Sequence, residues 1–399
     1  MTTGATPAKR GTEGLPATVL ILGLVSLLID IASEMVYPIL PVFLTVALGA
    51  SPMAMGSIEA GAEAIPSLLK GMFGRLADKP RRRKPLAVAG YGLSALGKGV
   101  LVAATGPMGV LASRWMDRVG KGVRTAPRDA IIAAVAPKGK AGKAFGVHRA
   151  MDSAGAAIGP LLAFLFLRSH AATRTADFRL PFMAATVFAV AGTLVLAFFV
   201  KDVAAQAPKK EAAPKVALPS TFWVVLIAGT VFSLGNSSDT FLLLRTSQLG
   251  VSAATVALIW ALYSAVYSVA SIPLGALSDR IGAKRVLAAG YVIFAGVYLS
   301  FAFVHDVRAI WGLWAVYGLY IAATDGVQKA LVARVVGPER RASAYGVLGM
   351  FTGVAVLPAS LMTGWLYTRQ GPAVAFGLSS ALAVLAAVVL ATVRLKEAV

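Results

Sequence analysis

The chain contains no cysteine and only three histidines among its 399 residues. The absence of cysteine excludes disulfides, thiolate metal sites and a thiol nucleophile, so redox chemistry does not indicate the compartment. No histidine stands in a His-Glu-x-x-His frame, and no nucleophile–base pair rises above background. We therefore expect no bound metal, no cofactor and no catalytic residues.

Charged residues are also scarce, at 14% of the chain, whereas apolar residues make up 57% and the mean hydropathy is +0.75. A soluble fold cannot bury that much apolar surface, because even a large domain keeps part of its chain at the water boundary. The net charge of +20 would suit nucleic acid, but the basic residues stand in short runs between long apolar stretches. The sequence thus predicts an integral membrane protein in contact with lipid, without a nucleic-acid partner.

Twelve stretches are long and apolar enough for a bilayer-spanning helix, which needs about 20 residues. The fourth carries so many charges that a hydropathy window alone is expected to miss it. The predicted spans cover residues 18–48, 52–76, 85–106, 108–135, 141–167, 180–200, 220–247, 253–277, 284–304, 309–335, 342–367 and 373–393.

Basic residues occupy alternate loops, from Lys9 and Arg10 before the first span to Arg394 and Lys396 after the last. The opposite loops carry almost none, with one exception, the loop that follows the fifth span. Cytoplasmic loops of membrane proteins have an excess of Lys and Arg. We therefore predict that both termini are cytoplasmic and that the protein lies in a bacterial inner (plasma) membrane.

The middle of the chain, residues 201–219, is rich in Ala, Pro and Lys and lacks an apolar face, which is typical of a flexible linker. The sequence of residues 74–78, Gly-Arg-Leu-Ala-Asp, returns at 275–279 as Gly-Ala-Leu-Ser-Asp, about two hundred residues later. We therefore predict a duplicated chain. Its parts are a cytoplasmic tail (1–17), a six-helix bundle (18–200), a cytoplasmic linker (201–219) and a second bundle (220–395).

At these repeats the chain resembles the Major Facilitator Superfamily of secondary transporters, over residues 18–395. That family's cytoplasmic signature is a Gly, an Asp four residues later, and then basic residues around a loop Gly. The matching residues are Gly275, Asp279, Arg280, Gly282 and Lys284 in the second half, and Gly74, Asp78 and Arg82 in the first, where Pro80-Arg81 replaces the loop Gly. The resemblance implies an all-α membrane protein with twelve transmembrane helices in two pseudo-symmetric six-helix bundles.

The signature carboxylates have a physical role in such a fold. Asp78 and Asp279 end helices beside basic loops, where a carboxylate pairs with Arg and faces the positive N-terminus of a neighbouring helix. A contact that forms in one conformation and breaks in the other acts as a conformational latch. The alternative is that these charges are solvated loop residues.

The fifth span carries Gly155, Gly159 and Pro160, which fit a family pattern associated with exporters. The Gly-Gly that completes the pattern is missing, so the direction of transport stays open. Independently of direction, the two glycines suit close packing between helices.

Ionisable residues inside the membrane cost about 2.5–3.5 kcal/mol each and usually face a cavity or a partner. On the fourth span they recur at three- and four-residue steps, which places them on one helical stripe about 21 Å long. Candidate partners stand on other spans. The predicted substrate and proton path comprises Asp30, Glu34, Arg114, Asp117, Arg118, Lys121, Arg124, Arg128, Asp152, Asp239 and Asp325.

By the resemblance, spans one, four, seven and ten surround a small-molecule substrate. We hypothesise that Arg118 and neighbouring bases bind anionic parts of that substrate, while Asp30 or Glu34 exchanges a proton. The protein would then be a monomeric, proton-coupled transporter working by alternating access. The open alternatives are a permanent network of internal salt bridges, a multidrug or toxic-ion efflux antiporter, and a non-transporting receptor or scaffold with the same fold.

Overall fold

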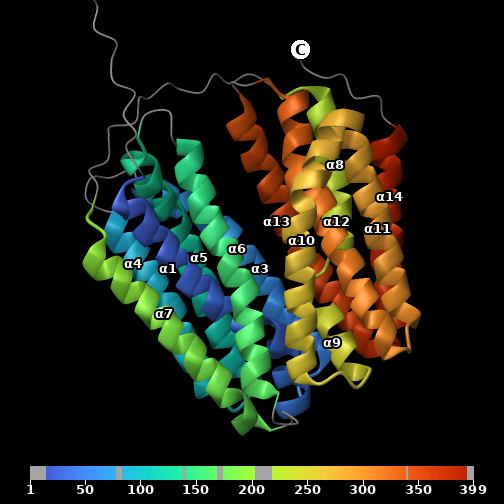
Figure 1. Ribbon diagram of the computed structural model, residues 1–399. Coiled ribbons are helices and arrows are strands. Elements are labelled where there is room, and N and C mark those ends of the chain that lie inside the picture. Colours follow the sequence, from blue (N-terminus) through green and yellow to red (C-terminus); the bar gives the residue numbers. More distant parts are fainter. Residues whose placement is uncertain are drawn as a thin grey trace, which may run out of the picture.

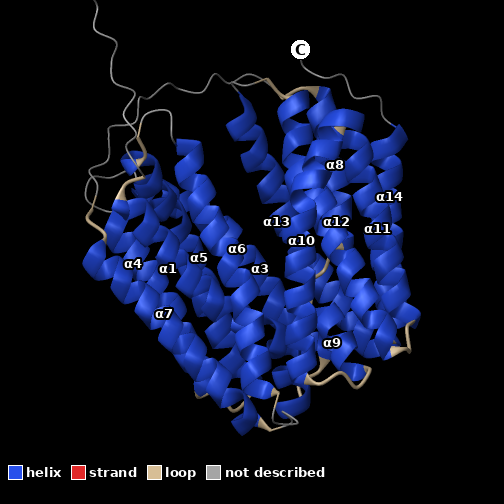
Figure 2. Cartoon of the chain, viewed as in Figure 1, coloured by secondary structure: helices blue, strands red, loops and turns tan. Residues whose placement is uncertain are grey.

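A computed structural model describes residues 15–77, 83–137, 141–168, 174–202, 218–337 and 340–392. Within these ranges the chain is almost entirely helical and contains no β-strand (Figure 2). The all-α fold class is therefore confirmed.

The first half begins with a span that changes its helical type at Tyr37. Pro38 and Pro41 lack a backbone N–H, which weakens the α-helical hydrogen-bond ladder, and short 3₁₀, α and π segments follow one another here. The elements of this half are α1 (Ala17–Val36), η1 (Tyr37–Ile39), α2 (Leu40–Val42), η2 (Phe43–Ala47), α3 (Pro52–Ala77), α4 (Arg83–Val102), α5 (Pro107–Val135), α6 (Ala141–Leu167), η3 (Thr175–Phe178) and α7 (Arg179–Phe199).

In the second half, the predicted seventh span over 220–247 is present but interrupted, because the helix ends at Gly235 and restarts at Thr240. The intervening residues, Asn-Ser-Ser-Asp, have side chains that compete with helical hydrogen bonds for the backbone. The elements of this half are α8 (Ser220–Gly235), α9 (Thr240–Gln248), α10 (Ala253–Ile281), α11 (Ala283–Phe303), α12 (Val307–Val335), α13 (Arg341–Gln370) and α14 (Pro372–Thr392).

With each interrupted span counted once, the described residues form twelve helical units of membrane-spanning length. Ten of them are also apolar enough to cross a membrane by composition. The fourth unit, α5, falls short, as its charges predict. The second, α3, falls short as well, which the sequence reading did not anticipate; it carries Glu59 and Glu63 among small residues.

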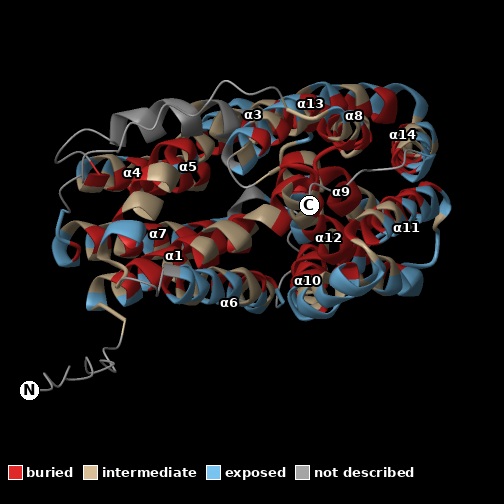
Figure 3. Ribbon diagram, turned by 90° about the horizontal axis from the view of Figure 1, so that it is seen from above, coloured by how far each residue is buried: buried red, intermediate tan, exposed pale blue. Residues whose placement is uncertain are grey.

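The twelve units form two bundles that lie side by side (Figure 3). The main contacts between them are α3 with α13 and α6 with α10. We call the face where α1 begins and α14 ends the terminal face, and the opposite one the loop face. The bundles converge at the loop face and diverge toward the terminal face (Figure 1).

Glycines explain how closely the bundles meet near the loop face. A Cβ atom at Gly56 of α3 would lie 2.8 Å from the carbonyl oxygen of Ser360 and 3.2 Å from the Cα of Gly364, both on α13. The backbone N–H of Met53 donates to the Thr368 hydroxyl at 2.9 Å. Near the terminal face, a Cβ at Gly146 or Gly346 would meet no atom within 4 Å. The bundles are therefore closed at the loop face and apart at the terminal face.

Within the first bundle, the predicted packing glycines lie where α6 crosses α1. A Cβ at Gly155 would stand 2.7 Å from the Leu27 carbonyl oxygen, and one at Gly159 would stand 2.6 Å from that of Ile31. The two backbones thus approach so closely that no side chain larger than hydrogen fits at these two positions of α6. Pro160 follows inside the same helix.

We expect Gly159→Ala to destabilise the protein by about 1–3 kcal/mol, because the new methyl group forces α1 and α6 apart. Thermal unfolding in detergent would measure this change. Gly146→Ala on the same helix is the matched control. Its methyl meets open space, and replacing a helical glycine by alanine gains up to about 1 kcal/mol. Equal melting temperatures for the two variants would contradict the packing argument.

Candidate functional site

Two adjoining cavities lie between α1, α4 and α5 in the first bundle. The deeper one, about 60 Å³, is bordered by charged residues of all three helices. The second, about 200 Å³, also borders α6 and includes residues nearer the terminal face, such as Arg128 and Arg149. The cavities share Asp30, Lys121 and Arg124, and both are large enough to hold water.

The structure brings most of the predicted path residues together here, because α5 continues as one helix from Pro107 to Val135 and its charged stripe faces α1 and α4. The deeper cavity is lined by the predicted residues Asp30, Glu34, Arg114, Asp117, Arg118, Lys121 and Arg124. Arg128 and Asp152 line the second cavity.

Two of the cations on or facing α5 are neutralised by carboxylates at hydrogen-bonding distance. Arg114 makes two bonds to Glu59 of α3, at 2.7 and 2.5 Å, and the Glu59 side chain is fully buried. Lys98 of α4 pairs with Asp117 at 2.9 Å. In the sequence, the only signal that Glu59 could be such a partner is its four-residue spacing from Glu63, which places both carboxylates on one helical face. These pairs satisfy charge inside the bundle and leave little of it for a ligand.

Three further cations are less closely paired, or not paired, with carboxylates in the described part of the chain. Arg118 lies 3.8 Å from Glu63, and its Nε atom is buried without a hydrogen-bond partner. Arg124 stacks on the Tyr91 ring, 4.7 Å from its centroid, and donates to the Ser94 hydroxyl. Lys121 forms no ion pair and remains exposed to solvent while lining both cavities. This side of the cavity is therefore positively charged, and Lys121 is its solvent-exposed cation.

The two carboxylates of α1 differ in their contacts. Asp30 makes no hydrogen bond and no ion pair within 4 Å among the described residues, although both cavities reach it. Glu34 accepts a hydrogen bond of 2.8 Å from the indole N–H of Trp260 on α10, in the other bundle. Trp260 also contacts the Tyr37 ring, at a centroid distance of 5.1 Å. Glu34 thus connects the two bundles at the deep end of the cavity.

At the second cavity, Asp152 of α6 faces two bases on its own helix. His148 lies 3.6 Å from its carboxylate and Arg149 lies 3.9 Å away, while one oxygen of Asp152 is buried without a hydrogen-bond partner. Arg149 is largely exposed, so this group lies where the cavity meets solvent.

The predicted residues of the second bundle do not join these cavities. Asp239 accepts a hydrogen bond of 2.5 Å from the Tyr317 hydroxyl, and Asp325 pairs with Lys329 at 2.8 Å. Arg245, on the same helix as Asp239, donates to backbone carbonyls of α11 and of the loop after it. Both described cavities are lined by the first half alone, so the symmetric arrangement expected from four central spans is not found there.

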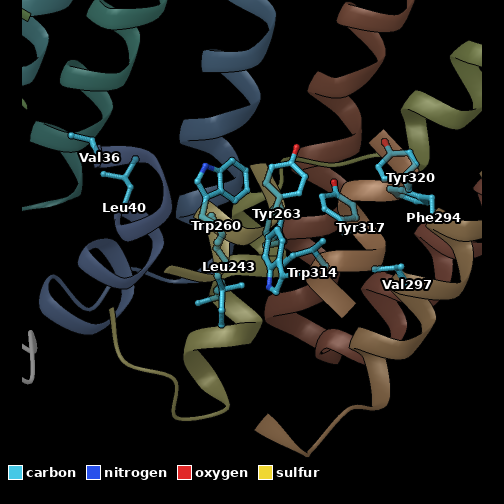
Figure 4. Close-up of a cluster of buried hydrophobic side chains, with 14 of the residues drawn as sticks. Val36, Leu40, Leu243, Trp260, Tyr263, Phe294, Val297, Trp314, Tyr317 and Tyr320 are labelled. Carbon is cyan, nitrogen blue, oxygen red and sulfur yellow. The ribbon is translucent and has the colours of Figure 1, made fainter. Parts of the chain in front are cut away.

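Aromatic rings fill the corresponding part of the second bundle. Figure 4 shows Trp260, Tyr263, Trp314, Tyr317 and Tyr320 in one cluster, with the hydroxyl groups of the three tyrosines pointing the same way. Neighbouring rings are 4.5 to 5.9 Å apart at their centroids, the separations at which aromatic pairs attract. This half therefore provides a rigid wall.

The signature residues of the second half lie at the terminal face. Gly282 joins α10 to α11 with φ of +97°, a conformation that only glycine adopts without strain, which explains the loop glycine. Asp279 pairs with Arg334 of α12 at 2.8 Å, within one bundle, and Lys284 donates to the carbonyl of Ala391. Arg280 is exposed. In the first half Gly74 lies in α3, and Asp78 and Arg82 fall outside the described residues.

Two helical bundles joined across a narrow contact, with a charged and accessible cavity within the membrane-spanning region, define a polytopic membrane protein of the solute-transporter class. The sequence profile of the Major Facilitator Superfamily matches residues 22–244 and 225–398. The chain belongs to this superfamily of membrane transporters.

The chain is similar to an uncharacterized MFS-type transporter of Methanocaldococcus jannaschii, at 34% identity over 94% of each chain. Its fold is similar to that of a mutant of the nucleoside transporter NupG, with a TM-score of 0.77, 14% identity, and 94% and 99% of the two chains covered. A bacterial homologue of the human lysosomal transporter Spinster, in an inward-facing and unoccupied conformation, gives a TM-score of 0.73 at 15% identity, with 97% and 96% covered.

Proposed function

We propose that the protein is a secondary active transporter that carries a small anionic solute by alternating access, coupled to proton movement. The observation that carries the proposal is the row Arg118, Lys121 and Arg124, in which only Arg118 has a carboxylate within 4 Å, and which lines the same cavities as the unpaired Asp30. A cationic wall with spare donors binds carboxylate or phosphate groups, and arginine does so with two parallel hydrogen bonds.

Asp30 supplies the coupling in this proposal. Both a substrate anion and the ionised Asp30 would be negative in one cavity, and two like charges at short range repel. Entry of the anion and uptake of a proton by Asp30 therefore favour each other. The geometry supports symport of anion and proton more directly than exchange.

The bundles are closed at the loop face and apart at the terminal face, which supports a carrier that opens on one side at a time. If the termini are cytoplasmic, as the distribution of Lys and Arg indicates, this conformation opens to the cytoplasm. Glu34, Trp260 and the Glu59–Arg114 pair would then form the barrier on the outer side.

Transport into proteoliposomes tests the proposal. We expect uptake of members of a small organic-anion library, accelerated by a proton gradient directed inward. Asp30→Asn should abolish the acceleration by the gradient while leaving anion binding intact, because asparagine copies the protonated state. Lys121→Gln should weaken anion binding at least tenfold, the effect of losing one charge-assisted contact of about 1.5–3 kcal/mol.

Lys143→Gln is the control, because Lys143 is an exposed lysine at the start of α6, away from both cavities. Full gradient-dependent transport by Asp30→Asn would exclude Asp30 as the proton site. If Lys121→Gln and Lys143→Gln transported equally well, the α5 charges would be a structural network and not a binding row.

A further inference from the structure

The seventh span leaves non-helical backbone at membrane depth. Between α8 and α9, the N–H of Asn236 bonds to the Phe232 carbonyl and that of Ser237 to the Gly235 carbonyl. The carbonyls of Ser233 and Leu234, which lie between these two acceptors, receive no backbone hydrogen bond in the described chain. In a membrane protein such backbone persists only where it is buried in protein or lines a hydrated site, so the break needs a reason.

Three side-chain oxygens around this break are buried without a hydrogen-bond partner. They are Oδ1 of Asn236, Oγ of Ser237 and the hydroxyl of Tyr298 on α11. The Asn236 amide donates to the Tyr320 hydroxyl at 3.2 Å, which leaves its Oδ1 as an unused acceptor. Ser237 is 3% exposed and Tyr298 is fully buried, so bulk water does not satisfy them. Buried polar groups in native proteins are rarely left in this state.

Asp239, at the start of α9, adds a negative charge to these oxygens. Its carboxylate accepts a hydrogen bond from Tyr317, but no basic side chain of the described chain lies within 4 Å of it. Arg245 on the same helix is engaged by two backbone carbonyls instead. A carboxylate removed from water without a counter-ion is strongly unfavourable, so a cation is expected beside it.

These groups belong to one cluster. The Tyr317 ring, whose hydroxyl donates to Asp239, lies 6.4 Å from the Tyr298 ring and 5.1 Å from the Tyr320 ring at their centroids. Tyr320 in turn accepts the hydrogen bond from the Asn236 amide. The hydroxyls of Tyr317 and Tyr320 point the same way at one end of the aromatic cluster (Figure 4).

We propose that the break between α8 and α9 binds a sodium ion. Asp239, Asn236 and Ser237 would provide side-chain oxygens, and the free carbonyls at the end of α8 would complete the coordination. All of these are hard oxygen ligands, and unwound membrane helices offer such carbonyls to sodium. A single carboxylate balances one positive charge, which favours a monovalent ion over calcium or magnesium.

Occupancy of this site would act on the contact between the bundles. Ser238, beside the proposed ligands, lies 3.5 Å from the Glu59 carboxylate of α3 through its hydroxyl. Its backbone N–H donates to the Ser360 hydroxyl of α13 at 3.2 Å. A bound ion would hold the break in the shape that makes these contacts, so sodium should favour the conformation closed at the loop face. This inference goes beyond the proposed function, since it involves neither the anion nor the proton.

Thermal unfolding of the purified full-length protein tests the site without any substrate. Sodium chloride would replace choline chloride at constant ionic strength and pH, and we expect a saturable rise of several degrees in melting temperature. Asp239→Asn should abolish the sodium-dependent rise. Asp306→Asn is the matched control: the same chemical change at an exposed N-cap of α12, where Asn caps about as well as Asp, should keep the sodium-dependent rise.

Ser237→Ala should keep the fold and shift the sodium midpoint at least tenfold to higher concentration, which covers the case in which Asp239→Asn does not fold. Potassium and lithium in place of sodium measure selectivity. No sodium-dependent rise in the wild type, or an undiminished rise in both Asp239→Asn and Ser237→Ala, would overturn the proposal. A melting temperature that responds to pH but not to sodium would assign the site to a proton. None of these outcomes depends on anion transport, so the two proposals fail separately.

Discussion

Glu59→Gln, with Arg114 left in place, is expected to destabilise the protein by about 3–5 kcal/mol. Arg114 donates two hydrogen bonds to Glu59, and the two side chains are 7% and 0% exposed. Removing the carboxylate leaves a buried guanidinium charge without its counter-ion, and breaking a buried ion pair in this way is strongly destabilising. The nearby Tyr37 ring, 5.3 Å from the guanidinium carbon, compensates for only part of that charge.

A double-mutant cycle measures the coupling between the two side chains. Glu59→Gln, Arg114→Met and the combined variant would be unfolded by heat or denaturant in the same detergent. We expect the combined variant to be more stable than either single one, because it contains no unpaired charge. The control is Lys329→Gln, which breaks the exposed Asp325–Lys329 pair and should cost at most about 1 kcal/mol. Additive losses in the cycle would mean that the Glu59–Arg114 contact is not a coupled pair.

Trp260→Phe is expected to shift the balance between conformations by about 10- to 100-fold. The substitution removes the one N–H that Trp260 donates to Glu34 across the bundles, while an aromatic ring remains next to Tyr37. A hydrogen bond to a charged group contributes about 1.5–3 kcal/mol, and each 1.4 kcal/mol changes a ratio of two states tenfold. The conformation closed at the loop face should lose population, because the bond stabilises that conformation and not one in which the bundles are apart at this face.

The absence of cysteine makes this shift directly measurable. Spin labels on Lys143→Cys and Ser343→Cys, at the terminal ends of α6 and α13, would report the separation of the bundles. Trp260→Phe should move the distance distribution toward shorter values. Trp314→Phe is the matched control, because its indole N–H bonds to Thr246 within the second bundle. The same shift in both variants would show that loss of aromatic packing, and not the Glu34 bond, is responsible.

Most of the architecture was accessible from the sequence because it depends on local and periodic features. Apolar length determines where a helix can cross a membrane, and the repeat at Gly74 and Gly275 marks the duplication. The spacing of the charges on α5 predicted one stripe, and that stripe lines the cavities. The break in the seventh span was missed because the stretch from Ser220 to Gln248 is apolar enough as a whole to pass for one span.

The sequence alone determined the spans through their apolar length, the duplication through the repeat, and the charged stripe through helical periodicity, which specifies the face of a helix on which a side chain lies. Periodicity does not specify which other helix that face meets. Glu59 pairs with Arg114 fifty-five positions away, while Lys121, on the same stripe, keeps its charge free in the accessible cavity. Likewise Asp239 lies beside tyrosines and a broken backbone, not beside the cations of α5. Those distinctions came only from the tertiary structure, because the cost of burying a charge depends on the distance to its partner and on access to water.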